Sequence, residues 1–160
     1  MFFSSAVLAL QLITTTFKPD ATVPMSMVAT DCGGKNVSPD LSWKDAPAKT
    51  KSFALIVHDP DAPRADGFDH WVVYDLPAGT THLSAGAQIA DSKTGVNGTG
   101  NTGYYGPCPP PGKTHHYVFT LYALDVPSIG ASQPLSASDL KAKIASHVLA
   151  TATLTGTFRT

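Results

Sequence analysis

Short runs of mainly apolar residues alternate along this 160-residue chain with long, polar, turn-forming segments. Five of these runs are rich in β-branched and aromatic residues, a composition typical of β-strands. They lie at residues 10–17, 53–58, 70–76, 115–124 and 149–158. One segment, 138–148, instead has apolar residues at helical spacing behind the serine that begins it. The pattern therefore predicts a single, mainly β domain with one short helix.

Alternation along a strand also sorts its residues between the two faces of the sheet. In the strand that begins at His115, Tyr117 shares the face of His115, and His116 is expected to point the opposite way. In the strand that begins at His70, the same rule puts His70 on the face of Val72. The two adjacent histidines, 115 and 116, are therefore expected to have different roles.

Titratable side chains stand where long loops meet the predicted strands. Asp59 and Asp61 directly follow one strand, and His70 and His115 open two others. If these strands are neighbours in a sheet, the four side chains meet at one edge of it. Long loops of this kind tend to carry function. This edge is therefore the candidate site, and three kinds of chemistry are open to it.

A metal site is the first alternative. It would combine Asp59 or Asp61 with His70 and with His115 or His116, giving two imidazoles and one carboxylate. These residues come from separate segments and lack the close spacing of a zinc motif such as H-E-x-x-H. We therefore predict no metal.

A nucleophilic site is the second alternative, with Cys108 activated by His115, seven residues further along the chain. It requires a free thiolate, and no motif of a known cysteine hydrolase surrounds this cysteine. The sequence also lacks the G-x-S-x-G motif of serine hydrolases. We therefore expect no enzymatic activity and no cofactor.

A small anion pocket is the third alternative and the one we predict. The imidazoles of His70 and His115 would donate N–H bonds to an oxyanion together with a tyrosine hydroxyl, and a nearby carboxylate would favour the charged imidazole. The backbone N–H groups of Gly106 and Cys108 would add donors, because the prolines around them have none to offer. The residues predicted for this pocket are Asp59, His70, Gly106, Cys108, Pro109, His115 and Tyr117.

Structural roles are the simpler interpretation for other residues. We expect Trp43 to pack in the core, as large aromatic side chains usually do. The Asp-Pro-Asp-Ala-Pro segment also fits a rigid turn in which Asp61 caps its own backbone. The histidines expected to be merely solvated or hydrogen-bonded are His58, His82, His116 and His147.

The charge distribution narrows the classes of partner. The chain has 11 lysines and arginines against 12 aspartates and glutamates, with no run of like charges. This pattern argues against nucleic acid and against an anionic membrane surface as partners. The apolar stretch 1–9 fits the remnant of a secretory signal or a tag, and it is shorter than the roughly 18 apolar residues that span a bilayer.

The only two cysteines, Cys32 and Cys108, lie far apart in Gly- and Pro-rich segments. The sequence allows one disulfide or two free thiols. A disulfide would fit a periplasmic or secreted protein, and free thiols would fit the cytoplasm, so both compartments remain open.

Three segments together resemble the signature regions of the phosphatidylethanolamine-binding proteins. They are DPDAP at 59–63, HWVVYDLP at 70–77 and GYYGPCPPPGKTHHYVFTLYALD at 103–125. The segments at 32–43 and 51–63 resemble the bacterial and archaeal branch, whose members are often called Raf kinase inhibitor-like proteins. The resemblance covers nearly the whole chain and involves several motifs in the right order.

The resemblance implies an antiparallel β-sandwich with a few short helices and a small cavity for phosphate-like anions. It transfers the site roles to Asp59, His70, His115 and Tyr117, with the turn 106–110 as one wall. Many relatives read His-Arg-Tyr where this chain has a second histidine, and that replacement removes a permanent positive charge beside the strand.

The resemblance has further implications for pairing and partners. It implies that Cys32 and Cys108 lie close together, and that they form a disulfide if the protein is exported. Similarity to prokaryotic relatives also implies a homodimer. The function we expect is non-enzymatic binding of phosphate, phosphoethanolamine or a similar phosphoryl or carboxylate group. The alternative is a protein-interaction regulator, a protease inhibitor or kinase-pathway modulator that acts through its surface on an unknown target.

Overall fold

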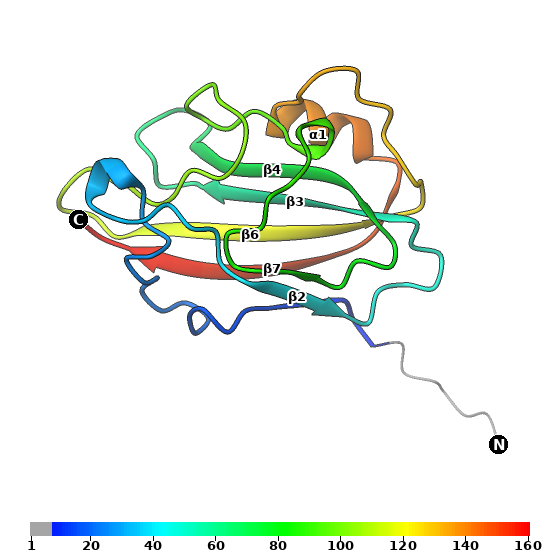
Figure 1. Cartoon of the computed structure of the whole chain (residues 1–160), viewed down its shortest axis with the longest axis horizontal. Coiled ribbons are helices and arrows are strands. Elements are labelled where there is room, and N and C mark those ends of the chain that lie inside the picture. Colours follow the sequence, from blue (N-terminus) through cyan, green and yellow to red (C-terminus); the bar gives the residue numbers. More distant parts are fainter. Residues whose placement is uncertain (1–7) are drawn as a thin grey trace.

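The computed structural model describes residues 8–160, so the expectation of a signal remnant or tag at 1–9 lies almost entirely outside the described residues. Strands dominate the described chain (Figure 1). They are β1 (Gln11–Ile13), β2 (Leu41–Lys44), β3 (Ser52–Asp59), β4 (Phe68–Pro77), β5 (His82–Leu83), β6 (His115–Leu124) and β7 (Val148–Phe158). The helices are α1 (Ala137–Ile144) and two 3₁₀ turns, Thr30–Cys32 and Asp91–Lys93. None of the helices in this part of the chain is long and apolar enough to cross a membrane.

Four antiparallel strands form the larger sheet, and Figure 1 shows them in the order β4, β3, β6 and β7. The central strand β3 is buried on both of its faces. Phe53 and Leu55 enter one hydrophobic core, whereas Ala54 and Ile56 enter another on the opposite side. A strand with apolar residues on both faces is stable only if a layer covers each side of the sheet.

Different elements cover the two faces of the larger sheet. The smaller antiparallel sheet, in the order β1, β2 and β5, packs on one face, and Trp43 lies in the core between the sheets as predicted. The helix α1 packs on the other face through Leu140 and Ile144. The predicted antiparallel β-sandwich is confirmed, with a helix added as a third layer.

The helix lies earlier in the chain than the sequence pattern predicted. Its N-cap is Ser136, whose hydroxyl accepts the N–H of Asp139 at 3.1 Å, rather than Ser138. The predicted range 138–148 was also wrong at its end, because Val148 is already the first residue of β7. Ser136, two residues before the predicted cap, begins the helix because its side chain bonds one of the first free N–H groups of the helix.

The first strand is shorter than the predicted run 10–17. The threonines that follow β1 leave the sheet because they bond Asp40 instead: Thr14 Oγ1 donates to its carbonyl at 2.6 Å, and the Thr15 N–H donates to its carboxylate at 3.2 Å. The strands β2 and β5 were not predicted, since four and two residues are too short to show a clear alternation.

The pairing of β4 with β3 shifts register at two places, and one of them lies at His70. Val57 lies opposite Trp71, and the next residue, His58, lies opposite Asp69. His70 therefore falls between two ladder pairs and forms a β-bulge. A bulge of this kind shifts the alternation of side chains by one residue.

The bulge corrects the predicted orientation of His70. Strict alternation placed His70 with Val72, which packs in the core under α1. Instead, the His70 ring lies on the other face, with its centroid 5.0 Å from that of Tyr117. The bulge thus brings His70 to the face that carries His115 and Tyr117.

Candidate functional site

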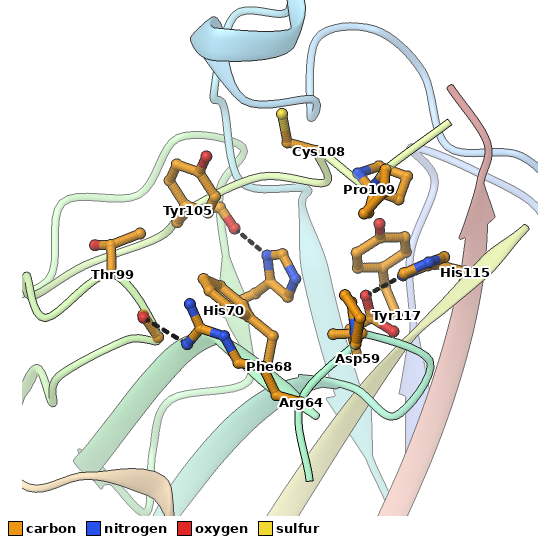
Figure 2. Close-up of a pocket in the computed structure, with 14 residues that line it drawn as sticks. Asp59, Arg64, Phe68, His70, Thr99, Tyr105, Cys108, Pro109, His115 and Tyr117 are labelled. Atoms are coloured by element: carbon orange, nitrogen blue, oxygen red, sulfur yellow. Dashed lines mark hydrogen bonds and ion pairs between the residues drawn. The ribbon is translucent and has the colours of Figure 1, made fainter. Parts of the chain in front are cut away.

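A cavity of about 330 Å³ opens at the end of the larger sheet, where β3, β4 and β6 meet their loops (Figure 2). This volume is typical of a site for a small ligand. Six of the seven residues predicted from the sequence line the cavity: Asp59, His70, Cys108, Pro109, His115 and Tyr117. The three loop-to-strand junctions therefore meet in space, as their sequence positions suggested.

Asp59 and His115 form a buried pair in the cavity. Nδ1 of His115 lies 2.6 Å from Oδ2 of Asp59, and their side chains are only 3% and 4% exposed. The other carboxylate oxygen accepts the N–H of Asp61 at 2.8 Å, so Asp59 caps this turn and the predicted cap, Asp61, does not. Because the carboxylate engages Nδ1, the His115 ring is fixed in orientation and keeps Nε2 for a ligand.

A second histidine–aspartate pair lies beside the first, on the exposed side of β6. Nδ1 of His116 lies 2.7 Å from Oδ2 of Asp61, and the His116 backbone N–H donates to the same oxygen at 2.9 Å. The hydrogen bond from the His116 ring lowers the pKa of Asp61. His116 lies outside the lining of the cavity, so its part is to hold the turn that carries Asp59.

His70 is held by the backbone of another loop. Its Nδ1 lies 2.6 Å from the carbonyl oxygen of Tyr105, and its ring packs against Phe68 with 4.6 Å between centroids (Figure 2). Burial lowers the pKa of His70 to about 4, although the Tyr105 carbonyl and the charge of Asp59 oppose this shift. His70 is therefore neutral near pH 7, which differs from the charged anion donor that we predicted.

Tyr117 brings a buried hydroxyl to the cavity. Within residues 8–160 this hydroxyl has no hydrogen-bond partner, although the side chain is almost completely buried. Figure 2 shows it pointing towards Pro109. Burial, with a smaller effect from the charge of Asp59, raises the pKa of Tyr117, so the group stays protonated and able to donate. Leaving a buried hydroxyl unsatisfied costs about 1–3 kcal/mol, which a ligand oxygen would recover.

The proline-rich turn forms one wall of the cavity, as the resemblance implied. Within it, Cys108 carries a backbone N–H between prolines that have none. Gly106 was predicted to be a second donor, and this was wrong, because its N–H donates to Oδ1 of Asn36 at 2.7 Å. Gly106 instead allows close packing, since a Cβ there would collide with the carbonyl oxygen of Met27.

A disulfide joins Cys108 to Cys32, whose Cα atoms are 5.5 Å apart although 76 positions separate them in the sequence. The pairing implied by the resemblance is thus present. It anchors the proline-rich wall to the 3₁₀ turn Thr30–Cys32.

Two observations concern the residues named for the alternative chemistries. A nucleophilic role for Cys108 requires a free thiolate, and its sulfur is bonded to Cys32. A metal site requires several ligands around one point, and the described part of the chain has no group of three His, Cys, Asp or Glu side chains arranged in that way.

Several residues that line the cavity were missed in the sequence, and Arg64 is the most important of them. Its guanidinium lies 5.0 Å from the ring centroid of Phe68, and Nη1 donates to the carbonyl oxygen of Gly98 at 3.2 Å. Among the described residues that line the cavity, Arg64 alone carries a permanent positive charge. The available signal was its place as the single cation of the loop that follows the DPDAP motif.

The fold and the cavity together define a class of protein: a two-sheet β domain with a small polar cavity at the end of its larger sheet, next to a disulfide-anchored wall. The chain belongs to the phosphatidylethanolamine-binding protein family, whose sequence model matches residues 13–159.

Sequence relatives agree with this membership. A UPF0098 protein of Aquifex aeolicus is 38% identical over 98% of this chain and 92% of its own length. The UPF0098 protein YbhB of Escherichia coli is 43% identical over 78% of this chain and 83% of its own length.

Solved structures agree as well. YbcL of Escherichia coli, described as a new member of the mammalian PEBP family, superposes with a TM-score of 0.89 at 34% identity, covering 96% of this chain and 99% of that one. The homologue CT736 of Chlamydia trachomatis gives a TM-score of 0.86 at 38% identity, covering 95% and 98%.

Proposed function

We propose that this protein binds a small anion with a phosphoryl or carboxylate group in the cavity beside Tyr117 and His115. The observation that carries the proposal is the buried hydroxyl of Tyr117, which has no hydrogen-bond partner within the described chain and points towards Pro109 in the cavity wall (Figure 2). A ligand that completes the hydrogen bonding of such a group would remove the stability cost of leaving it unpaired.

The surrounding groups support an anion as the ligand. Cys108, which has a backbone N–H between prolines, and Arg64, which carries a guanidinium, both line the cavity. His115 is held by Asp59 through Nδ1, and its charged form would donate to an anion from Nε2. Both carboxylate oxygens of Asp59 are already engaged within the protein. The negative charge of Asp59 therefore serves to orient His115 rather than to meet a cationic part of the ligand.

Replacing Tyr117 by phenylalanine separates binding from stability. We expect Tyr117→Phe to bind inorganic phosphate about tenfold or more weakly, because a hydrogen bond to a charged group is lost. The midpoint of urea unfolding should stay the same or rise, because the deleted hydroxyl has no partner among the described residues. Titration calorimetry and urea unfolding of both proteins measure these effects.

A matched control is Tyr122→Phe, since Tyr122 lies on the opposite face of β6 and packs against the core under α1. This variant should bind phosphate like the wild type. Equal binding by Tyr117→Phe and the wild type would contradict the cavity assignment and favour the alternative of a surface that regulates another protein.

Arg64 should contribute through its charge at the mouth of the cavity. We expect Arg64→Gln to weaken phosphate binding by about two- to fivefold at low salt, the range of exposed charge pairs. The salt dependence of binding should also become shallower, because screening then has one fewer charge to act on. Lys113→Gln is the control, since Lys113 lies 3.6 Å from Asp61 rather than in the cavity lining. An unchanged salt dependence in Arg64→Gln would show that its guanidinium does not reach the anion.

A further inference from the structure

One ring nitrogen of His70 is available to a ligand, and the hydrogen bond of the other nitrogen determines its chemistry. Nδ1 lies 2.6 Å from the carbonyl oxygen of Tyr105. A carbonyl oxygen only accepts hydrogen bonds, so the hydrogen is on Nδ1. In Figure 2, Nε2 lies on the opposite side of the ring, the side towards Tyr117 and Asp59. In a neutral ring this nitrogen has a lone pair and acts as an acceptor.

The surroundings keep the His70 ring neutral. The side chain is buried, and burial is the largest effect that lowers its pKa, to about 4. The charges of Asp59 and Asp69 act in the opposite direction, and His58 adds to the lowering. Near pH 7, Nε2 therefore faces the cavity as an acceptor, in a lining that also contains the residues of three donors: the Tyr117 hydroxyl, the Cys108 N–H and the Arg64 guanidinium.

An acceptor in an anion pocket restricts which anions fit. The hydroxyl of Tyr117, the N–H of Cys108 and the guanidinium of Arg64 suit unprotonated ligand oxygens. The lone pair of His70 Nε2 repels such an oxygen and is satisfied only by a hydrogen atom on the ligand. A fully ionised oxyanion would leave this buried acceptor unpaired, which is costly.

We propose that the cavity selects an oxyanion that carries its own hydrogen-bond donor, a phosphoryl group with one protonated oxygen that donates to Nε2 of His70. This inference rests on the proposed function and makes it narrower. Inorganic phosphate and singly protonated phosphate monoesters have the required P–OH group. Sulfate and the phosphodiester of a lipid headgroup have none, although the ammonium of an ethanolamine headgroup is a second source of a donor.

The first test compares anions of similar shape by titration calorimetry at pH 7. Phosphate should bind about 10- to 100-fold more tightly than sulfate, because sulfate leaves the acceptor unsatisfied. Equal or tighter sulfate binding would overturn the inference and leave the proposed function intact, whereas no binding of either anion would overturn the proposed function itself. Dimethyl phosphate should behave like sulfate. Phosphoethanolamine and phosphocholine distinguish the two sources of a donor, because both are phosphate monoesters but only phosphoethanolamine has N–H groups. Equal affinities would support recognition of P–OH, whereas tighter binding of phosphoethanolamine would assign the donor to its ammonium.

A substitution tests whether His70 causes the selectivity. His70→Asn offers an amide that can present either N–H or C=O, so the preference for phosphate over sulfate should disappear. His147→Asn is the control: its ring is likewise held through Nδ1, which lies 2.8 Å from Oδ1 of Asp125, but it lies at the opposite end of β6. That variant should keep the preference, and loss of selectivity in both variants would contradict a specific role of His70.

A measurement on the wild-type protein tests the inference even if the His70→Asn variant does not fold. Nitrogen-15 NMR of labelled histidine distinguishes the two neutral tautomers from the charged ring. We expect His70 to be neutral with its hydrogen on Nδ1 at pH 7. A ring with its hydrogen on Nε2, or a charged ring, would overturn the inference. As the pH is lowered towards 4, Nε2 gains a hydrogen, so the ratio of phosphate to sulfate affinity should fall.

Discussion

Replacing Cys32 and Cys108 by serine is expected to lower the free energy of unfolding by about 4 kcal/mol. A disulfide restricts the unfolded chain, and the chain-entropy relation gives about this value for a separation of 76 residues. The same bond anchors the wall of the cavity, so phosphate binding should weaken in the double variant as well. Urea unfolding and calorimetry measure the two effects.

Reduction of the wild-type protein supplies the control. Dithiothreitol should shift the wild type towards the unfolding midpoint of the serine variant and leave that variant unchanged. The mass of the unreduced wild type should be lower than that of the reduced protein by two hydrogens. An unfolding midpoint that does not differ between wild type and double variant would show that the bond contributes little to stability.

Replacing His115 by alanine should damage both stability and binding. The substitution removes the partner of Asp59, whose side chain is only 4% exposed, and leaves a buried carboxylate oxygen unpaired. Breaking a buried pair in this way costs about 3–5 kcal/mol. Phosphate binding should fall below detection, because the variant loses Nε2 and the oriented ring together.

His116→Ala is the matched control, because His116 also bonds an aspartate and stands next in the sequence. That pair is exposed, so the loss should be at most about 1 kcal/mol. The double variant Asp59→Asn, His115→Ala should be more stable than His115→Ala, since it no longer buries an unpaired charge. Equal destabilisation by the two histidine substitutions would contradict the buried role assigned to Asp59.

Much of the fold was predictable because the long strands are rich in β-branched and aromatic residues and are bounded by turn-forming segments. The run 115–124 was predicted with the bounds of β6, and His115, Tyr117 and His116 lie on the expected faces. Long strands show their period clearly. β2 and β5 were missed because a few residues show no period, and the helix was displaced because two serines compete to cap it.

The sequence predicted those site residues whose side-chain type and position at a strand end suggest a role. It did not predict features that arise from contacts between distant segments. Asp59 and His115 were found as titratable groups at strand ends. The N–H of Gly106 is taken by Asn36, 70 positions away, and no local pattern reveals that bond. Arg64 likewise lines the cavity with its guanidinium packed on the Phe68 ring, a contact that the sequence pattern does not show. The protonation state of His70 depends on burial and on one carbonyl, which only the folded chain supplies.

Because of the bulge at His70, the site depends on the number of residues in β4 as well as on their type. Because of the extra residue at this bulge, the side chains of β4 before His70 alternate out of step with those that follow it. Deleting one residue there would restore regular pairing at this end of β4 and turn the imidazole away from the cavity, without removing any residue of either hydrophobic core. The scaffold and the site are thus separable: a related chain can retain every strand of this sandwich and still lack the cavity's acceptor.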